Sequence, residues 1–180
     1  MTCIDLGANV GDYTRMMASV AKRVIAFEPD PWTLEVLQAN VTDLENVRIE
    51  NVAAGTYEGR VQLYRHVRFE DNPVLHSGSS SLIASKSNVT EAGAVGVRQI
   101  DFIDYLERLD EDIGILKVDI EGAEVDLLEA MLGRPEIMKR IDYIFVETHE
   151  SRIPSHKHRV KLLQDRVQEL QQPKINLHWS

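Results

Sequence analysis

Short apolar runs alternate with stretches of helical periodicity along most of this chain. The apolar runs, typical of buried strands, occupy residues 4–6, 24–27, 47–51, 61–64, 113–118 and 143–146, with an edge strand expected at 175–179. Apolar side chains recur at helical spacing within residues 13–22, 31–44, 102–109, 123–132 and 156–170. This alternation predicts an α/β fold with a mostly parallel, twisted sheet and helices on both faces.

Local signals mark some helix ends and one long loop. Asp30 is a predicted N-cap followed by Pro31 at the first helical position, and Ser155 is predicted to cap the last helix. The periodicity fails from His66 to about Gly96, and a loop of that length is usually functional or mobile. Because no internal repeat or boundary signal is present, residues 1–180 are predicted to form one domain.

The first predicted strand leads into a turn of small residues. Asp5 lies in the strand, Gly7, Asn9 and Gly11 lie in the turn, and the second strand is followed by the acid Glu28. In a strand–turn–helix–strand unit, small turn residues let the backbone approach a nucleotide-like ligand, and the later acid binds ribose hydroxyls. Asn is the side chain that best tolerates a positive φ after Gly. The unit therefore predicts a nucleoside cofactor.

The spacing and charge of the turn separate two kinds of cofactor. Dinucleotide enzymes hold a pyrophosphate with G-x-G-x-x-G, and the glycines here fall at a different spacing. Asp5 and Asp12 are acids, which attract a cation and repel phosphate. S-adenosylmethionine carries a sulfonium and an ammonium, so it is the predicted cofactor. The alternatives are a nicotinamide-dependent oxidoreductase, a non-catalytic scaffold and a tight turn without a ligand.

Polar side chains follow two later predicted strands. Asp119 and Glu121 come after the central apolar run, and Glu147 and His149 come after the next one. Side chains two apart on an extended chain face the same way. Because one helix separates the two strands, we expect the strands to be neighbours and the four side chains to meet at the carboxyl edge of the sheet, where ligands bind.

His149 is the predicted general base of this cluster. An imidazole with an unperturbed pKa of about 6.5 can take a proton from a hydroxyl near neutral pH. The alternative for His149 is a hydrogen bond to the following loop. Asp119 is predicted to hold the cofactor or orient the base, and Glu121 either joins the catalytic cluster or forms the acidic first turn of a helix. These three residues offer ligands for a divalent ion, but without a spacing signature no metal is predicted.

Composition narrows the choice of partners. Lys and Arg number 20 against 29 Asp and Glu, for a net charge of −9, which disfavours nucleic acid because phosphates need a basic patch. Cys3 is the single cysteine, so a reducing compartment is expected. The sequence has neither an apolar run of membrane-spanning length nor a signal-peptide pattern. The protein is predicted to be cytoplasmic, with no nucleic-acid or membrane partner.

Six segments within about the first 150 residues form a recognisable series. They are Asp5–Gly11 (DLGANVG), Phe27–Asp30 (FEPD), Asn51–Gly55 (NVAAG), Gly78–Leu82 (GSSSL), Lys117–Glu124 (KVDIEGAE) and Val146–His149 (VETH). In this order they resemble the FkbM-type methyltransferase family. The resemblance implies a Rossmann-like class I fold and an S-adenosylmethionine-dependent methyltransferase. It also implies O-methylation of a hydroxyl on a sugar or another small natural product.

The resemblance also implies roles for individual residues. The methionine part of the cofactor would lie between Asp5, Gly7, Asn9 and Gly11. Glu28 would take the ribose hydroxyls, and Asn51 with Ala53 would border the adenine. The residues expected to lie over the active site and contact the acceptor are Ser79, Ser80 and Ser81.

Two departures from the family concern the ends of the chain. Family members usually carry sequence before the first strand, whereas this chain begins almost on it, so we expect a shortened N-terminus without the helix that would close over the cofactor. The usual terminal antiparallel strand is either formed by residues 174–179 or missing. A second subunit of a homo-oligomer would be one way to cover the site, and the oligomeric state stays open.

Overall fold

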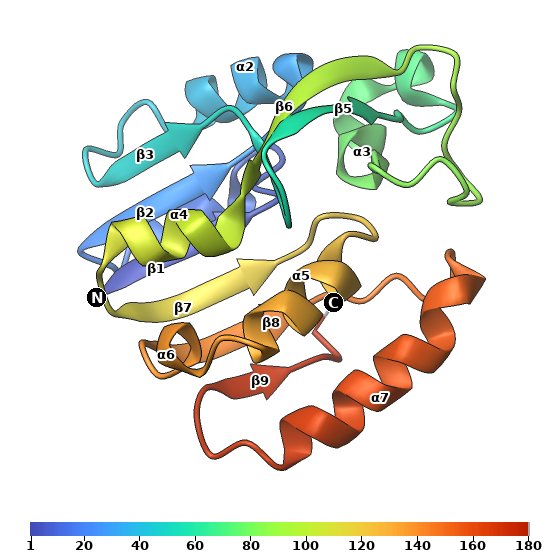
Figure 1. Ribbon diagram of the computed structural model, residues 1–180. Helices are drawn as coiled ribbons and strands as arrows, with labels where there is room; N and C mark the ends of the chain where they lie inside the picture. The colour runs from blue at the N-terminus through green and yellow to red at the C-terminus, as the bar shows by residue number, and fades with distance from the viewer. Residues whose placement is uncertain (180) are drawn as a thin grey trace.

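A six-stranded sheet forms the centre of the computed structural model, which describes residues 1–179 (Figure 1). Its strands, in order across the sheet, are β3 (Val47–Glu50), β2 (Arg23–Phe27), β1 (Thr2–Leu6), β7 (Ile113–Val118), β8 (Ile141–Val146) and β9 (Lys174–Asn176). Every neighbouring pair is parallel. The predicted parallel α/β fold is confirmed, and so is the adjacency of β7 and β8.

Helices cover both faces of this sheet, as predicted. On one face, α1 (Asp12–Ala18) and α2 (Pro31–Asn40) pack against the strands, with Met17 of α1 against Cys3 and Val24. The larger core lies on the other face and takes side chains from α4 (Phe102–Leu109), α5 (Glu124–Leu132), α6 (Pro135–Met138) and α7 (Lys157–Gln168). Successive residues of a strand point to opposite faces, so Ile4 and Leu6 belong to this second core.

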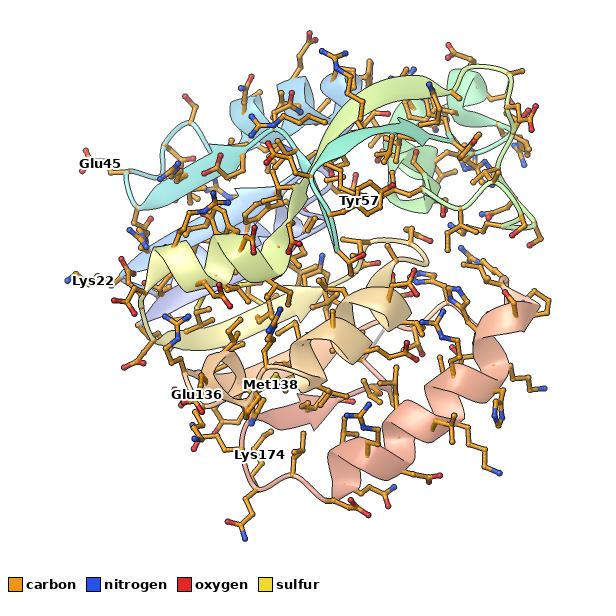
Figure 2. All side chains as sticks on the ribbon, in the orientation of Figure 1. Lys22, Glu45, Tyr57, Glu136, Met138 and Lys174 are labelled. Carbon is orange, nitrogen blue, oxygen red and sulfur yellow. The ribbon has the colours of Figure 1, made fainter. Side chains whose placement is uncertain are left out.

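A second sheet has three strands, and the sequence predicts only one of them as a strand. Its order is β4 (Ala53–Gly55), β6 (Val95–Asp101) and β5 (Gly59–Leu63), with β6 parallel to β4 and antiparallel to β5. The sequence analysis misses β6, because Gly96 and the exposed Arg98 interrupt its apolar pattern. Buried Gln99 donates a hydrogen bond from Nε2 to the carbonyl oxygen of Tyr57, a residue labelled in Figure 2 (3.0 Å).

Residues 64–94, here named the roof segment, connect β5 to β6 on the side of the sheet where the central strands end (Figure 1). They contain the turns η1 (Phe69–Asp71) and η2 (Ser77–Ser79) and the short helix α3 (Pro73–His76). Antiparallel bridges between Tyr64 and Ser81 and between His66 and Val89 fold the segment back on itself. The stretch that the sequence analysis treats as one long loop is therefore a series of short, bonded turns.

Two predicted helix starts have different outcomes. Asp30 caps α2 as predicted, since its side chain accepts hydrogen bonds from the N–H groups of Trp32 (2.8 Å) and Thr33 (3.3 Å). The Ser155 prediction is wrong, because Ser155 lies inside the turn η3 (Pro154–His156) and His156 occupies the N-cap of α7 without a side-chain bond.

Three further features differ from the prediction, and the first is that α2 ends at Asn40, not at residue 44. The first helix ends at Ala18, not at residue 22, because the N–H groups of Val20 and Ala21 both bond to the carbonyl oxygen of Met17 before β2 begins. The last strand, β9, runs parallel to β8, not antiparallel. Within residues 1–179, no helix has the length and apolar character needed to cross a bilayer.

Candidate active site

The turn between β1 and α1 has the left-handed backbone that its residues predict. Gly7 has φ 75°, Asn9 has φ 50° and Gly11 has φ 99°. A Cβ atom on Gly7 would lie 1.8 Å from the carbonyl oxygen of Asp119. The turn can therefore approach the end of β7 only with glycine at this position.

A cavity that is partly open to solvent lies above this turn at the carboxyl edge of the sheet, and together with the solvent space at its mouth it measures about 600 Å³. Seven of the predicted site residues line it: Gly7, Asn9, Glu28, Ala53, Ser80, Asp119 and Glu121. In the part of the chain that the structure describes, the other six predicted site residues do not line the cavity. They are Asp5, Gly11, Asn51, Ser79, Ser81 and His149. The predicted residues thus form a cavity wall and a set of supports around it.

Glu28 is the buried acid of the cavity wall. Its carboxylate accepts hydrogen bonds from the N–H groups of Asn9 (2.9 Å) and Asp30 (2.8 Å). Burial raises the pKa of Glu28 to about 7, although both N–H bonds favour the charged form. A carboxylate has about four acceptor positions, so two remain for hydroxyl donors in the cavity.

Asp5 lies beneath the turn and not in the cavity. It is fully buried, its Oδ2 accepts a bond from the Thr14 hydroxyl of α1 (2.6 Å), and its Oδ1 lies 3.0 Å from Nζ of Lys117. Lys117 is also buried, donates to the carbonyl oxygen of Gly7 (2.7 Å) and lies 3.6 Å from Oδ2 of Asp119. The sequence analysis gives Lys117 no role, although it is the only charged residue in the apolar run of β7.

Asn51 and Gly11 support the turns that shape the cavity. Nδ2 of Asn51 donates to the carbonyl oxygens of Glu28 (2.8 Å) and Pro29 (3.3 Å), which fixes the chain after β2. Gly11 is the N-cap of α1, and a Cβ there would lie 2.7 Å from Cδ1 of Leu37.

Two serines of the roof segment, Ser77 and Ser80, line the cavity, and Ser79 and Ser81 support it from outside. Ser80 lines the cavity, and its buried Oγ has no hydrogen-bond partner within residues 1–179. The Ser81 hydroxyl donates to the carbonyl oxygen of Glu121, and the Ser79 carbonyl accepts from Lys86. Ser77, which the sequence analysis does not single out, donates to Oδ1 of Asn9 (2.6 Å) and joins the roof segment to the turn.

His149 lies buried behind the cavity, among carboxylates. Its Nδ1 lies 3.0 Å from Glu124, and its Nε2 lies 3.1 Å from Glu121, 3.8 Å from Glu147 and 3.9 Å from Asp119. Burial alone would lower the pKa of His149, but the bond to Glu124 and the surrounding negative charges outweigh it and raise the pKa to about 9. An imidazole with this pKa keeps its proton at neutral pH.

Glu124 is the residue of this cluster that the sequence analysis misses. It is fully buried, and its carboxylate accepts bonds from the N–H groups of Ile120 (3.0 Å) and Gly122 (2.7 Å) as well as facing His149. Its place in the KVDIEGAE segment is the available signal. A carboxylate at this helix start is favoured by the exposed backbone N–H groups.

Asp119 lies partly in the cavity wall and partly among the cluster's charges. Its side chain is 24% exposed, whereas Oδ1 is buried 3.9 Å from Nε2 of His149 and has no hydrogen-bond partner within residues 1–179. Burial, together with the nearby charges of Glu121 and Glu147, raises the pKa of Asp119 to about 7 against the opposing effect of Lys117 and His149.

Internal cations already face the acidic groups of this cluster. Asp119, Glu121 and His149 offer ligand atoms within 4.8 Å of one another, a spacing that a metal ion could bridge. The buried ammonium of Lys86 is ion-paired with Glu121, and the imidazole of His149 carries a proton. A divalent ion would have to compete with both.

Comparison with known proteins places this geometry in a family. Residues 5–170 match the methyltransferase FkbM domain family. "Methyltransferase 1" of Beauveria bassiana (strain ARSEF 2860) is 26% identical over 164 residues, which cover 83% of this chain and 65% of that protein, just under two thirds of its length. A crystal structure of methyltransferase FkbM from Methylobacillus flagellatus KT is 21% identical, with a TM-score of 0.47 over 77% of this chain and 30% of that one. Through the match to most of its length, this chain belongs to the FkbM methyltransferase family.

Proposed function

We propose that this methyltransferase binds S-adenosylmethionine in the cavity above Gly7 and methylates a hydroxyl oxygen of a small molecule, such as a sugar or another natural product. The observation that carries the proposal is the buried carboxylate of Glu28, fixed by two backbone N–H groups at the edge of that cavity. Two hydroxyls of a ribose are donors that would complete its hydrogen bonding and favour its charged form.

The charge of the cavity wall supports a cationic cofactor. Glu28, Asp119 and Glu121 line the cavity, whereas no Lys or Arg of residues 1–179 does. The nearby ammonium of Lys117 bonds to Asp5 and to the Gly7 carbonyl instead. Such a wall attracts a sulfonium and an ammonium and repels a pyrophosphate, which disfavours a nicotinamide dinucleotide. When bound, S-adenosylmethionine supplies a methyl group on a positively charged sulfur.

The chain must also take up the proton that a hydroxyl loses when it is methylated. His149 is protonated at neutral pH, so we assign this task to the carboxylate of Asp119, which lines the cavity and is 24% exposed. A pKa of about 7 suits an acceptor near neutral pH. In this assignment His149 is a positioning residue, whose positive charge is held by Glu124 and faces Asp119 and Glu121.

Replacing Glu28 with Gln should weaken the binding of S-adenosylhomocysteine by roughly 10–100-fold, because hydrogen bonds to a charged acceptor are lost. Isothermal titration calorimetry of wild type and Glu28→Gln measures this. The matched control is Glu50→Gln, at the end of the neighbouring strand β3, where the carboxylate pairs with Arg48 and does not line the cavity. It should bind as the wild type does.

Wild-type protein that binds neither S-adenosylmethionine nor S-adenosylhomocysteine at millimolar concentration would refute the proposal. Thermal stabilisation by NAD in the same buffer, with none from either sulfur compound, would favour the oxidoreductase alternative.

NMR titration of the His149 imidazole should give a midpoint near pH 9, and Glu124→Gln should lower it because the strongest charged partner is lost. Since the folded-state pKa lies above the unfolded value of about 6.5, the pairing stabilises the fold fully below pH about 6.5 and ceases to do so as the pH passes about 9. A wild-type midpoint at or below 6.5 would return the role of base to His149 and remove it from Asp119.

A further inference from the structure

Lys86 is a fully buried charged residue that comes from the roof segment. The exposed fraction of its side chain is 0%, and its Nζ forms an ion pair with the Glu121 carboxylate. The same ammonium donates to the carbonyl oxygen of Ser79 (2.8 Å). A buried ammonium is costly unless it is paired and hydrogen-bonded, so this position has to be held by the surrounding structure.

Both partners of Lys86 belong to the cavity region. Glu121 follows β7, lines the cavity and has φ 57°, a left-handed conformation that is unfavourable for Glu. Ser79 adjoins Ser80, which also lines the cavity. Lys86 therefore joins two segments that line the cavity, the roof segment and the end of β7, through one side chain.

Two other contacts hold residues 77–86 in the same place, and Arg65 at the start of the roof segment is ion-paired with Asp30 (2.7 Å). The Ser81 hydroxyl donates to the Glu121 carbonyl oxygen, so Glu121 is bonded to the roof segment through its backbone as well as its side chain. At the other end, Ser77 donates to Asn9 of the β1–α1 turn (2.6 Å). Of the three links made by residues 77–86, the one through Lys86 is the one made by charged groups, so its removal should change these residues most.

We infer that Lys86 is a positioning residue that fastens the roof segment to Glu121 and thereby sets the affinity of the cavity for its cofactor. The inference rests on the proposed function for the identity of that cofactor. Without Lys86, residues 77–86 lose their charged link to β7 while Glu121 keeps a buried charge with His149 as its remaining cationic neighbour. The roof should open more often, and a ligand that needs the closed cavity should bind less tightly.

The first experiment compares Lys86→Met, Lys86→Arg and Arg68→Met. Lys86→Met should weaken S-adenosylhomocysteine binding about tenfold and raise deuterium uptake over residues 77–86. Lys86→Arg keeps the charge and should recover part of the affinity. Arg68→Met is the matched control, because Arg68 lies in the same segment, is 66% exposed and pairs only with exposed Asp71. It should change neither measurement.

A double-mutant cycle with Glu121→Gln tests whether Lys86 acts through Glu121. Lys86→Met combined with Glu121→Gln removes both charges, so it avoids the unpaired buried charge that could unfold a single variant. If the two residues act as one link, the double variant should bind S-adenosylhomocysteine no more weakly than the worse single variant. Losses that multiply to about a hundredfold would overturn the inference.

Deuterium uptake separates this inference from the proposed function, because it needs no cofactor. Uptake over residues 77–86 that is equal in wild type and Lys86→Met would overturn the role of Lys86 whatever the cofactor is. If the wild type fails to bind S-adenosylhomocysteine while Lys86→Met still raises that uptake, the proposed function fails and the fastening role stands. A Lys86→Arg variant that folds but recovers none of the lost affinity would also contradict the role of the ion pair with Glu121.

Discussion

Replacing Gly7 with alanine should destabilise this protein by about 2–5 kcal/mol, since it combines a left-handed backbone cost of about 1–2 kcal/mol with overpacking of about 1–3 kcal/mol. Gly7 has φ 75°, and the added Cβ would lie 1.8 Å from the backbone oxygen of Asp119. Backbone cannot give way as a flexible side chain can. The clash would separate the turn from β7, where the Asp119 N–H bonds to the Leu6 carbonyl oxygen (3.1 Å).

Gly93 offers a matched control for this substitution. It has φ 86°, but apart from Gly93 itself and its two chain neighbours no heavy atom of residues 1–179 lies within 4 Å of its Cβ position, so Gly93→Ala should cost only the backbone conformation, about 1–2 kcal/mol. Urea unfolding followed by circular dichroism measures both variants. Equal destabilisation of the two would contradict a role for the Asp119 contact.

The parts of the fold predicted from the sequence are those that local residue order determines. The buried strand Ile113–Val118 is an apolar run, and the β1–α1 turn has glycine or asparagine wherever φ is positive. Once strands are known to be parallel, residues that follow them must meet at one edge, which is why Asp119, Glu121, Glu147 and His149 could be predicted as neighbours.

The parts that were missed depend on contacts between distant residues. Lys86 pairs with Glu121 across 35 positions of sequence, and His149 bonds to Glu124 across 25. No local pattern identifies a buried lysine within a polar stretch. β6 was missed for a related reason. Its buried Gln99 donates a hydrogen bond to a carbonyl oxygen 42 positions away, a partner that only the folded chain provides.

The roles of two predicted residues changed because of their surroundings. Asp5 was expected beside the cofactor, but strand alternation points its side chain toward Thr14 of α1. His149 was expected to act as a base from the pKa of a free imidazole, whereas four neighbouring carboxylates favour its charged form. Sequence position indicated the right neighbourhood in both cases, and the direction and environment of the side chain came only from the structure.

Replacing Lys117 with methionine should destabilise the fold by about 3–5 kcal/mol, because it leaves the fully buried Asp5 without its cation. Burial favours the neutral form of Lys117, but Asp5 and Asp119 outweigh it and raise the pKa of Lys117, so the ammonium contributes stability up to strongly alkaline pH. Urea unfolding at neutral pH measures the loss.

The charge-balanced variant, Asp5→Asn with Lys117→Met, distinguishes the lost pairing from lost packing. If most of the cost of Lys117→Met is the uncompensated carboxylate, the double variant should recover most of it, since an amide can still accept the Thr14 hydroxyl bond. A double variant as unstable as Lys117→Met would mean that the bond from Lys117 to the Gly7 carbonyl dominates instead. In either variant Asp119 loses the ammonium of Lys117, which lies 3.6 Å away, so the pKa of Asp119 should rise above about 7. The pH at which methyl transfer begins should rise with this pKa.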